Sequence, residues 1–90
     1  MRVRRGAARH EVLLVFDDLE ELRRWGSPSL TLDAHLAEIR AHAAQLRALA
    51  IPHDAVAFDG AAYLAWLGAA PDTADARELW ARSAGPRIDL

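Results

Sequence analysis

Cysteine is absent from this sequence of 90 residues, and so is lysine. Without cysteine the chain can form no disulfide framework, no thiolate zinc site and no cysteine nucleophile, which fits a reducing cytoplasm. Apolar runs are short, and none approaches the roughly 20 residues that a membrane-spanning helix needs. The amino terminus lacks a continuous apolar segment followed by a small-residue cleavage site, so no secretory signal is expected. We therefore expect a cytoplasmic protein that does not enter a membrane.

Familiar catalytic motifs are missing as well. The sequence contains no glycine-rich phosphate loop, no serine in a nucleophile elbow and no paired histidines of the metalloprotease type. Length sets a further limit, because 90 residues make one small domain with little room for a deep pocket. We expect no cofactor, and we favour a protein that is not an enzyme.

Charge is distributed unevenly along the chain. The first ten residues hold Arg2, Arg4, Arg5 and Arg9 without any acidic residue. The remaining eighty hold seven arginines against 13 acidic residues, which gives this part a net charge near −6. Residues 1–9 are therefore interpreted as a basic arm. Such an arm is either a solvated tail or a contact for phosphate, as in a dimeric DNA-binding regulator, although the acidic body would repel nucleic acid.

The most unusual stretch is residues 60–71, twelve residues without a charge. Wound as a helix, it places leucines and aromatic rings on one side and alanines on the other, so it is apolar all round. A helix of this kind must be covered on both sides, and so short a chain offers little protein to cover it. We predict an interface here, with a second copy or another protein as the cover. The predicted interface residues are Tyr63, Leu64, Trp66, Leu67 and Ala70.

The rest of the chain predicts alternating strands and helices. Residues 10–16 and 53–58 read as buried strands, because they combine consecutive apolar residues with β-branched and aromatic types. Four helices are expected: one from the Asp17 cap to about Trp25, one over 32–50 after Thr31, the uncharged helix after Asp59, and one over 74–83 after Thr73. A single domain thus spans 10–84, and residues 85–90 form a tail that is extended or disordered.

An offset of 42 residues aligns the two halves of this domain. Phe16 then matches Phe58, Gly26 matches Gly68 and Thr31 matches Thr73. The chain resolves into two strand-helix-helix units, 10–50 and 53–84, related either by duplication or because equivalent structures select equivalent residues. The fold class is α+β, or small α/β, with the order βααβαα. Two parallel strands are too few for a sheet, so we expect dimerisation, or a strand from Arg2 to Arg5, to complete it.

Asp17 and Asp59 are the strongest candidates for chemistry. Each follows a predicted strand, and two parallel strands would bring both carboxylates to the crevice where open α/β sheets bind ligands. Two close carboxylates could hold Mg²⁺ or share acid and base roles, as in a metal-dependent enzyme. The favoured interpretation is simpler, namely that each aspartate caps the helix behind it.

The histidines are weaker candidates. His35, Glu38 and His42 share a helical face, but the two imidazoles lie about 10 Å apart along the axis, too far to bind one ion. Hydrogen bonding on the helix surface or a dimer seam is favoured over a metal site. His10 and His53 stand at the start of the two predicted strands and are interpreted as boundary residues. The three tryptophans, Trp25, Trp66 and Trp80, are expected to serve packing first and interfaces second.

Three functional hypotheses follow. The favoured one is a non-catalytic interaction or regulatory module, a homodimer that self-associates through the uncharged helix. The first alternative is the dimeric DNA-binding regulator with its arginine arm. The second is the metal-dependent enzyme with Asp17 and Asp59.

Overall fold

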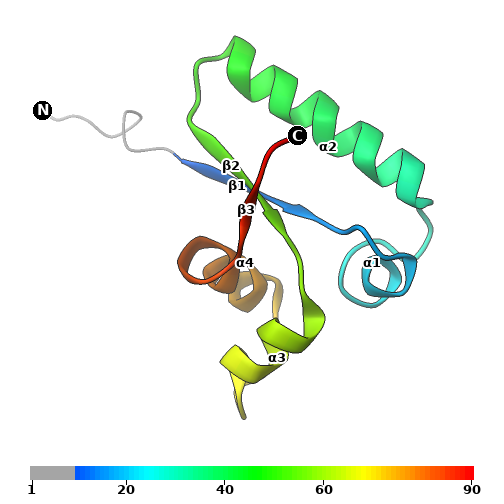
Figure 1. The fold of residues 1–90 in the computed structure, drawn as a ribbon, viewed down its shortest axis with the longest axis vertical. Helices are drawn as coiled ribbons and strands as arrows, with labels where there is room; N and C mark the ends of the chain where they lie inside the picture. The colour runs from blue at the N-terminus through cyan, green and yellow to red at the C-terminus, as the bar shows by residue number, and fades with distance from the viewer. Residues whose placement is uncertain (1–9) are drawn as a thin grey trace, which may run out of the picture.

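The computed structural model describes residues 10–90 and shows a small mixed α+β domain, with four helices and a three-stranded sheet in that part of the chain (Figure 1). The elements in chain order are β1 (Glu11–Val15), α1 (Leu19–Trp25), α2 (Leu32–Ala48), β2 (His53–Ala57), α3 (Gly60–Leu67), α4 (Ala74–Ser83) and β3 (Arg87–Ile88). Within residues 10–90, no helix is both long enough and apolar enough to cross a lipid bilayer. The strands and helices expected from the sequence all form, with small shifts of their ends.

The sheet has the order β1-β2-β3. β1 and β2 are parallel, with Leu13 beside Ala55, and β3 runs antiparallel to β2, with Ile88 beside Ala55. The sequence predicted that the tail, residues 85–90, is either extended or disordered. The third strand shows that it is extended. The tail is extended here because Ala57 N–H donates to Pro86 O at 3.1 Å and fixes the chain against β2. The central strand is therefore β2.

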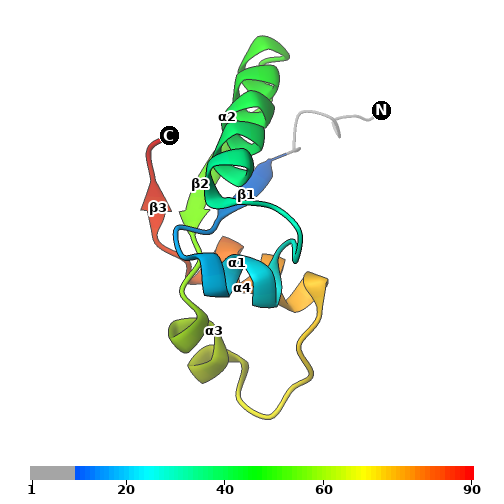
Figure 2. The same cartoon turned by 90° about the vertical axis from the view of Figure 1, so that its right-hand side faces the viewer.

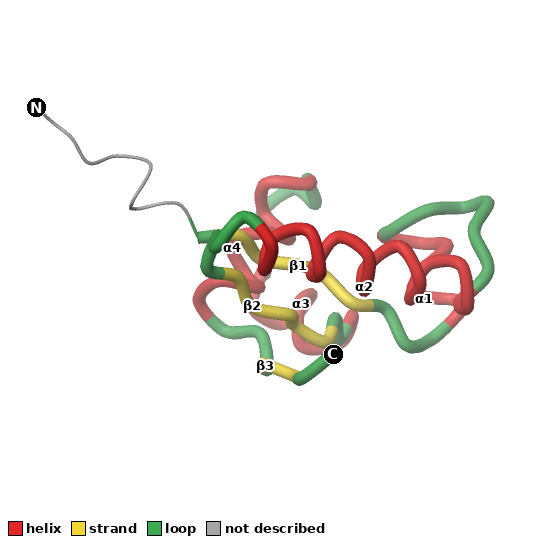
Figure 3. Tube along the Cα trace, turned by 90° about the horizontal axis from the view of Figure 1, so that it is seen from above, coloured by secondary structure: helices red, strands yellow, loops and turns green. Residues whose placement is uncertain are grey.

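Alternation of side chains along β1 and β2 divides the core into two layers. On one face, Leu13 packs with Ala43 and Leu46 of α2. On the other face, Val56 packs against α4 in the larger cluster that also includes residues of α1 and α3. Figures 1 and 2 show α2 on one side of the strands, with α3 and α4 on the other. Figure 3 shows that α2 lies along the β1 side of the sheet, while β3 lies at the opposite edge.

The larger cluster is centred on Phe58, immediately after β2. Its ring lies 4.9 to 5.5 Å, between centroids, from the rings of four other residues: Phe16, Trp25, Tyr63 and Trp80. Offset and edge-on contacts of this kind are favourable beyond the apolar area that they bury. The prediction that tryptophans serve packing is confirmed for Trp80, which is 2% exposed, and for half-buried Trp25. Trp66, by contrast, is 41% exposed.

Helix caps confirm three sequence predictions and correct one. Thr31, Asp59 and Thr73 each accept a hydrogen bond from the backbone N–H three residues later. The prediction that Asp17 caps α1 was wrong, because Asp18 has this role and accepts from Glu21 N–H at 3.0 Å. The shift of one residue arises because Asp18 is still extended, with φ −126° and ψ 130°, so the helix begins after it. The predicted end of α2 at residue 50 also moves to Ala48, and Ala50 adopts a positive φ of 55°.

Gly85 lies where the chain turns from α4 into β3, against the central strand. A Cβ atom at this position would overlap Val56 Cγ1 and would lie 3.1 Å from the Cα of Ala81. Both neighbours are fully buried, so neither has free space into which it can move. Glycine is therefore needed here for the close approach of α4 and β2.

We predict that Gly85→Ala lowers the free energy of unfolding by about 1 to 3 kcal/mol, because it overpacks this contact. Urea denaturation followed by circular dichroism measures the change. Ala84→Ser is the control, since it adds one atom at the exposed neighbouring position and should change the unfolding free energy by less than about 0.5 kcal/mol. Equal stability of Gly85→Ala and the wild type would contradict the close contact.

Candidate interaction surface

α3 is fixed to the domain along one side only. Gly60 is buried, its N–H donates to Glu21 Oε2 at 2.7 Å, and an added Cβ would lie 2.5 Å from Trp25 Cζ3. Tyr63 is completely buried in the large cluster, with its ring 5.5 Å from that of Phe58. These contacts lie one helical turn apart and hold one side of α3 against α1 and the core.

A polar network also holds the same helix, through the hydroxyl group of Tyr63. Tyr63 Oη donates to Asp72 Oδ1 at 2.6 Å, and the same oxygen accepts from Arg77 Nη1 at 2.8 Å. Burial raises the pKa of Tyr63, and its hydrogen bond to Asp72 raises it further. Tyr63 therefore stays a neutral donor and ties α3 to the start of α4.

The opposite side of α3 and the residues after it face solvent. We call this the α3 surface, and it consists of Ala61, Ala62, Leu64, Ala65, Trp66, Ala69 and Ala70. Leu64 and Trp66 are each 41% exposed, and the Trp66 ring stacks on that of Tyr63 at 6.3 Å between centroids. No charged residue lies between Gly60 and Pro71, so this surface is apolar throughout. Exposed apolar patches of this kind mark interaction sites in soluble proteins.

The five residues predicted as an interface are thus divided between core and surface. Leu64, Trp66 and Ala70 belong to the α3 surface. Tyr63 lies in the protomer's own core, and Leu67 is half-buried against it. The helical pattern assigned all five residues to one interface. It could not show which side of the helix the rest of the domain would cover.

A cavity of about 680 Å³ adjoins the α3 surface between α1 and α3. Trp25, Ala61 and Leu64 form apolar parts of its lining, and Arg24 lies 4.4 Å from the centroid of the Trp25 ring. The remaining lining residues are Asp18, Glu20, Glu21 and Gly60. The carboxylates give the rim an acidic character, although Asp18 and Glu21 also accept backbone hydrogen bonds within the domain.

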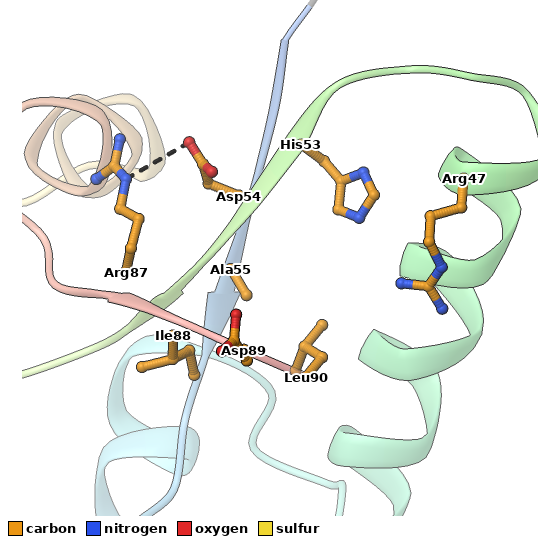
Figure 4. A pocket seen from close by; sticks show the side chains of 8 residues that line it. All are labelled: Arg47, His53, Asp54, Ala55, Arg87, Ile88, Asp89 and Leu90. Carbon is orange, nitrogen blue, oxygen red and sulfur yellow. Dashed lines mark ion pairs between the residues drawn. The ribbon is translucent and has the colours of Figure 1, made fainter.

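A second groove, of about 490 Å³, lies between α2 and β3 over the central strand (Figure 4). It exists because α2 covers the β1 side of the sheet and because Ala55 is small. In Figure 4 the side chains of Arg47, from α2, and His53, from β2, point toward one another at one side of the groove. His53 Nδ1 lies 3.0 Å from Ile51 O, and since a carbonyl oxygen only accepts, Nδ1–H is the donor.

Other charged groups at this groove are engaged within the protein. Asp54 Oδ2 lies 3.0 Å from His10 Nε2 and 3.5 Å from Arg87 Nε. Arg87 Nη1 also donates to Ala81 O at 2.6 Å and Gly85 O at 3.0 Å, near the end of α4. Arg87 therefore joins β3 to α4 and to the central strand, which is a structural role that the sequence pattern did not indicate.

The two aspartates predicted as possible metal ligands have different surroundings. Asp59 Oδ1 accepts from Ala62 N–H at 3.1 Å and caps α3, whereas Asp17 is exposed and caps no helix. Among residues 10–90, no group of three or more His, Cys, Asp or Glu side chains is placed to hold a metal ion. The arm of Arg2, Arg4, Arg5 and Arg9 lies outside the described residues.

His35 has a structural role that sequence analysis missed. Its side chain is 7% exposed, and Nε2 accepts a hydrogen bond from Phe16 N–H at 3.0 Å, just beyond β1. Burial lowers the pKa of His35, while the negative charge of Glu38 opposes this effect. The imidazole is therefore neutral with its proton on Nδ1. His42, two turns later, is exposed, so the two histidines have different surroundings within the protomer.

Comparisons with protein-family models, with curated proteins and with solved structures gave no match for this chain.

We predict that the free energy of unfolding decreases as the pH falls below about 6.5, the ordinary value for histidine. The pKa of His35 is lowered in the folded state, so the unfolded state binds more protons in this range and is favoured. Urea denaturation at pH 5 to 8 measures the slope of the unfolding free energy against pH. His35→Gln keeps an acceptor for Phe16 N–H and should reduce the slope, whereas His42→Gln at an exposed site should leave it unchanged. Equal slopes in the wild type and His35→Gln would contradict this assignment.

Proposed function

We propose that this protein is a non-catalytic interaction module that self-associates through the α3 surface. The observation that supports the proposal is the exposure of Leu64 and Trp66, each 41%, on a segment without charge. Burial of such side chains against a second copy removes apolar area from water at roughly 25 cal/mol per Å². Tryptophan is also among the residues that most often dominate binding energy at interfaces.

A twofold contact suits this surface. In a twofold dimer the same patch of both copies meets itself, so an uncharged patch brings no like charges together. The adjoining cavity, with Trp25 and Ala61 in its lining, gives the Trp66 ring of a second copy an apolar wall to pack against. The acidic rim would remain at the edge of the contact, where charges stay in water.

We also propose that the strand-helix-helix units 10–50 and 53–84 are equivalent halves in a βααβαα arrangement, with the sheet extended by dimerisation. Thr31 and Thr73 cap α2 and α4 in the same way, and Gly26 and Gly68 each end the short helix of their unit. The parallel, in-register pairing of β1 with β2 agrees with this relation. The α1 cap departs from it, since Asp18 rather than Asp17 corresponds in role to Asp59.

We expect Trp66→Arg to weaken self-association, because a guanidinium would have to be desolvated without a partner in a dry contact. Size-exclusion chromatography with light scattering measures the mass over a range of concentrations. The variant should have a lower average mass than the wild type at equal concentration, with its helix content retained in circular dichroism because the side chain is partly exposed.

Ala44→Arg is the matched control. It introduces the same charge at an exposed position of α2, outside the α3 surface, and arginine is a good helix former. Its mass should equal that of the wild type. A wild type that stays monomeric at high concentration, or a Trp66→Arg variant with the wild-type mass, would refute the α3 contact.

A further inference from the structure

β1 lies at an edge of the sheet in the part of the chain that the structure describes. Its odd-numbered residues bond to β2: Glu11 N–H donates to Pro52 O at 3.0 Å, and Val15 O accepts from Phe58 N–H at 2.9 Å. Successive residues of a strand direct their N–H and C=O groups to opposite sides. The backbone groups of Val12 and Leu14 therefore point away from β2, along the outer edge.

Side chains occupy this outer edge at both ends. Phe16 N–H donates to His35 Nε2 at 3.0 Å, and His10 O accepts from Arg82 Nη1 at 3.0 Å. Between these two points, the N–H and C=O groups of Val12 and Leu14 have no hydrogen-bond partner among residues 10–90. Both residues are half-buried in the large cluster, where unpaired backbone groups are costly.

We propose that β1 of a second copy of this chain pairs antiparallel with this edge, about a twofold axis at Leu13. Val12 then faces the partner's Leu14, and Leu14 faces the partner's Val12. Each of these pairs exchanges two hydrogen bonds, one from each N–H, as hydrogen-bonded pairs do in antiparallel sheets. The two sheets become one continuous sheet across the axis.

A second copy fits this edge better than an unrelated strand because the open groups are self-complementary. Val12 and Leu14 each offer one N–H donor and one C=O acceptor. A twofold rotation about Leu13 places every donor of one copy opposite an acceptor of the other. His35 and Arg82 already bond to the backbone at the two ends of this edge, so only Val12 and Leu14 can form hydrogen bonds with another strand. The twofold pairing about Leu13 uses these two residues and no others. Residues 12–16 contain no proline and no charge, the usual features that prevent edges from pairing.

This proposal rests on the sheet extension by dimerisation proposed above and specifies its pairing, on a surface different from the α3 surface. α3 lies beyond the end of β2, and its exposed side chains take no part in the β1 edge. Substitutions at Trp66 and at Val12 therefore test the two contacts separately. If both contacts form, each single variant retains the other contact, and the double variant is monomeric.

Val12→Pro is the first test. Proline removes the outward N–H at this position, while the hydrogen bonds to β2 remain because Val12 does not contribute to them. Val12→Ala is the matched control, since it loses the same apolar side chain but keeps the N–H. Light scattering over a concentration series should show self-association weakened roughly tenfold in the proline variant relative to the alanine variant. Equal association of the two variants would overturn the proposal.

Amide hydrogen exchange in the wild-type protein is the second test, and it remains decisive if Val12→Pro does not fold. The Val12 and Leu14 amides should be protected at high concentration and should exchange faster on dilution, while Leu13 and Val15, bonded to β2, stay protected. Rapid exchange at Val12 and Leu14 at every concentration would overturn the proposal. Protection of both amides in a monomer would also overturn it.

Discussion

The contacts of Phe58 are the constraint on which the other elements depend. This residue follows the central strand, and its ring meets those of Phe16, Trp25, Tyr63 and Trp80. These four rings come from the end of β1 and from three different helices. A single cluster therefore fixes α1, α3 and α4 relative to the sheet, and α2 packs on the other face, where Leu46 lies against Leu13. In a domain of this size, much of the packing energy resides in such large aromatic side chains.

One consequence of this arrangement is the exposed side of α3. The helix is only eight residues long and contributes Tyr63 to the cluster, so one side is held and the other stays in water. Trp66 then lies outside the core, although it is as apolar as Trp80. The hydrogen bonds of Gly60 to Glu21 and of Tyr63 to Asp72 prevent the helix from rotating to bury the other side. The free apolar surface is thus a result of tertiary contacts and supports an interaction module as the proposed function.

Polar side chains define the limits of the sheet. His35 occupies one end of the outer edge of β1, and Arg82 occupies the other through His10 O. On the opposite side, Arg87 binds carbonyl groups near the end of α4 and lies beside Asp54, which fixes the short strand β3. These residues are far apart in the sequence and follow no recognisable motif, so the helical pattern indicated surface hydrogen bonding or a dimer seam for His35. Its burial and its lowered pKa depend on where α2 crosses the end of β1.

The sequence by itself determined the two longer strands, the helices and three of the four N-caps, because hydrophobic periodicity and capping are local properties of neighbouring residues. It also determined that residues 60–71 carry no charge and that an apolar helix begins after Asp59. Tertiary structure decided the rest: that Tyr63 is buried while Leu64 and Trp66 are exposed, that Asp18 replaces Asp17 as the cap, and that residues 87–88 complete a third strand. The physical reason is that a helix apolar on every side has no preferred orientation of its own. Its orientation is set by the partners that it meets, here Phe58, Glu21 and Asp72, and these are distant in sequence.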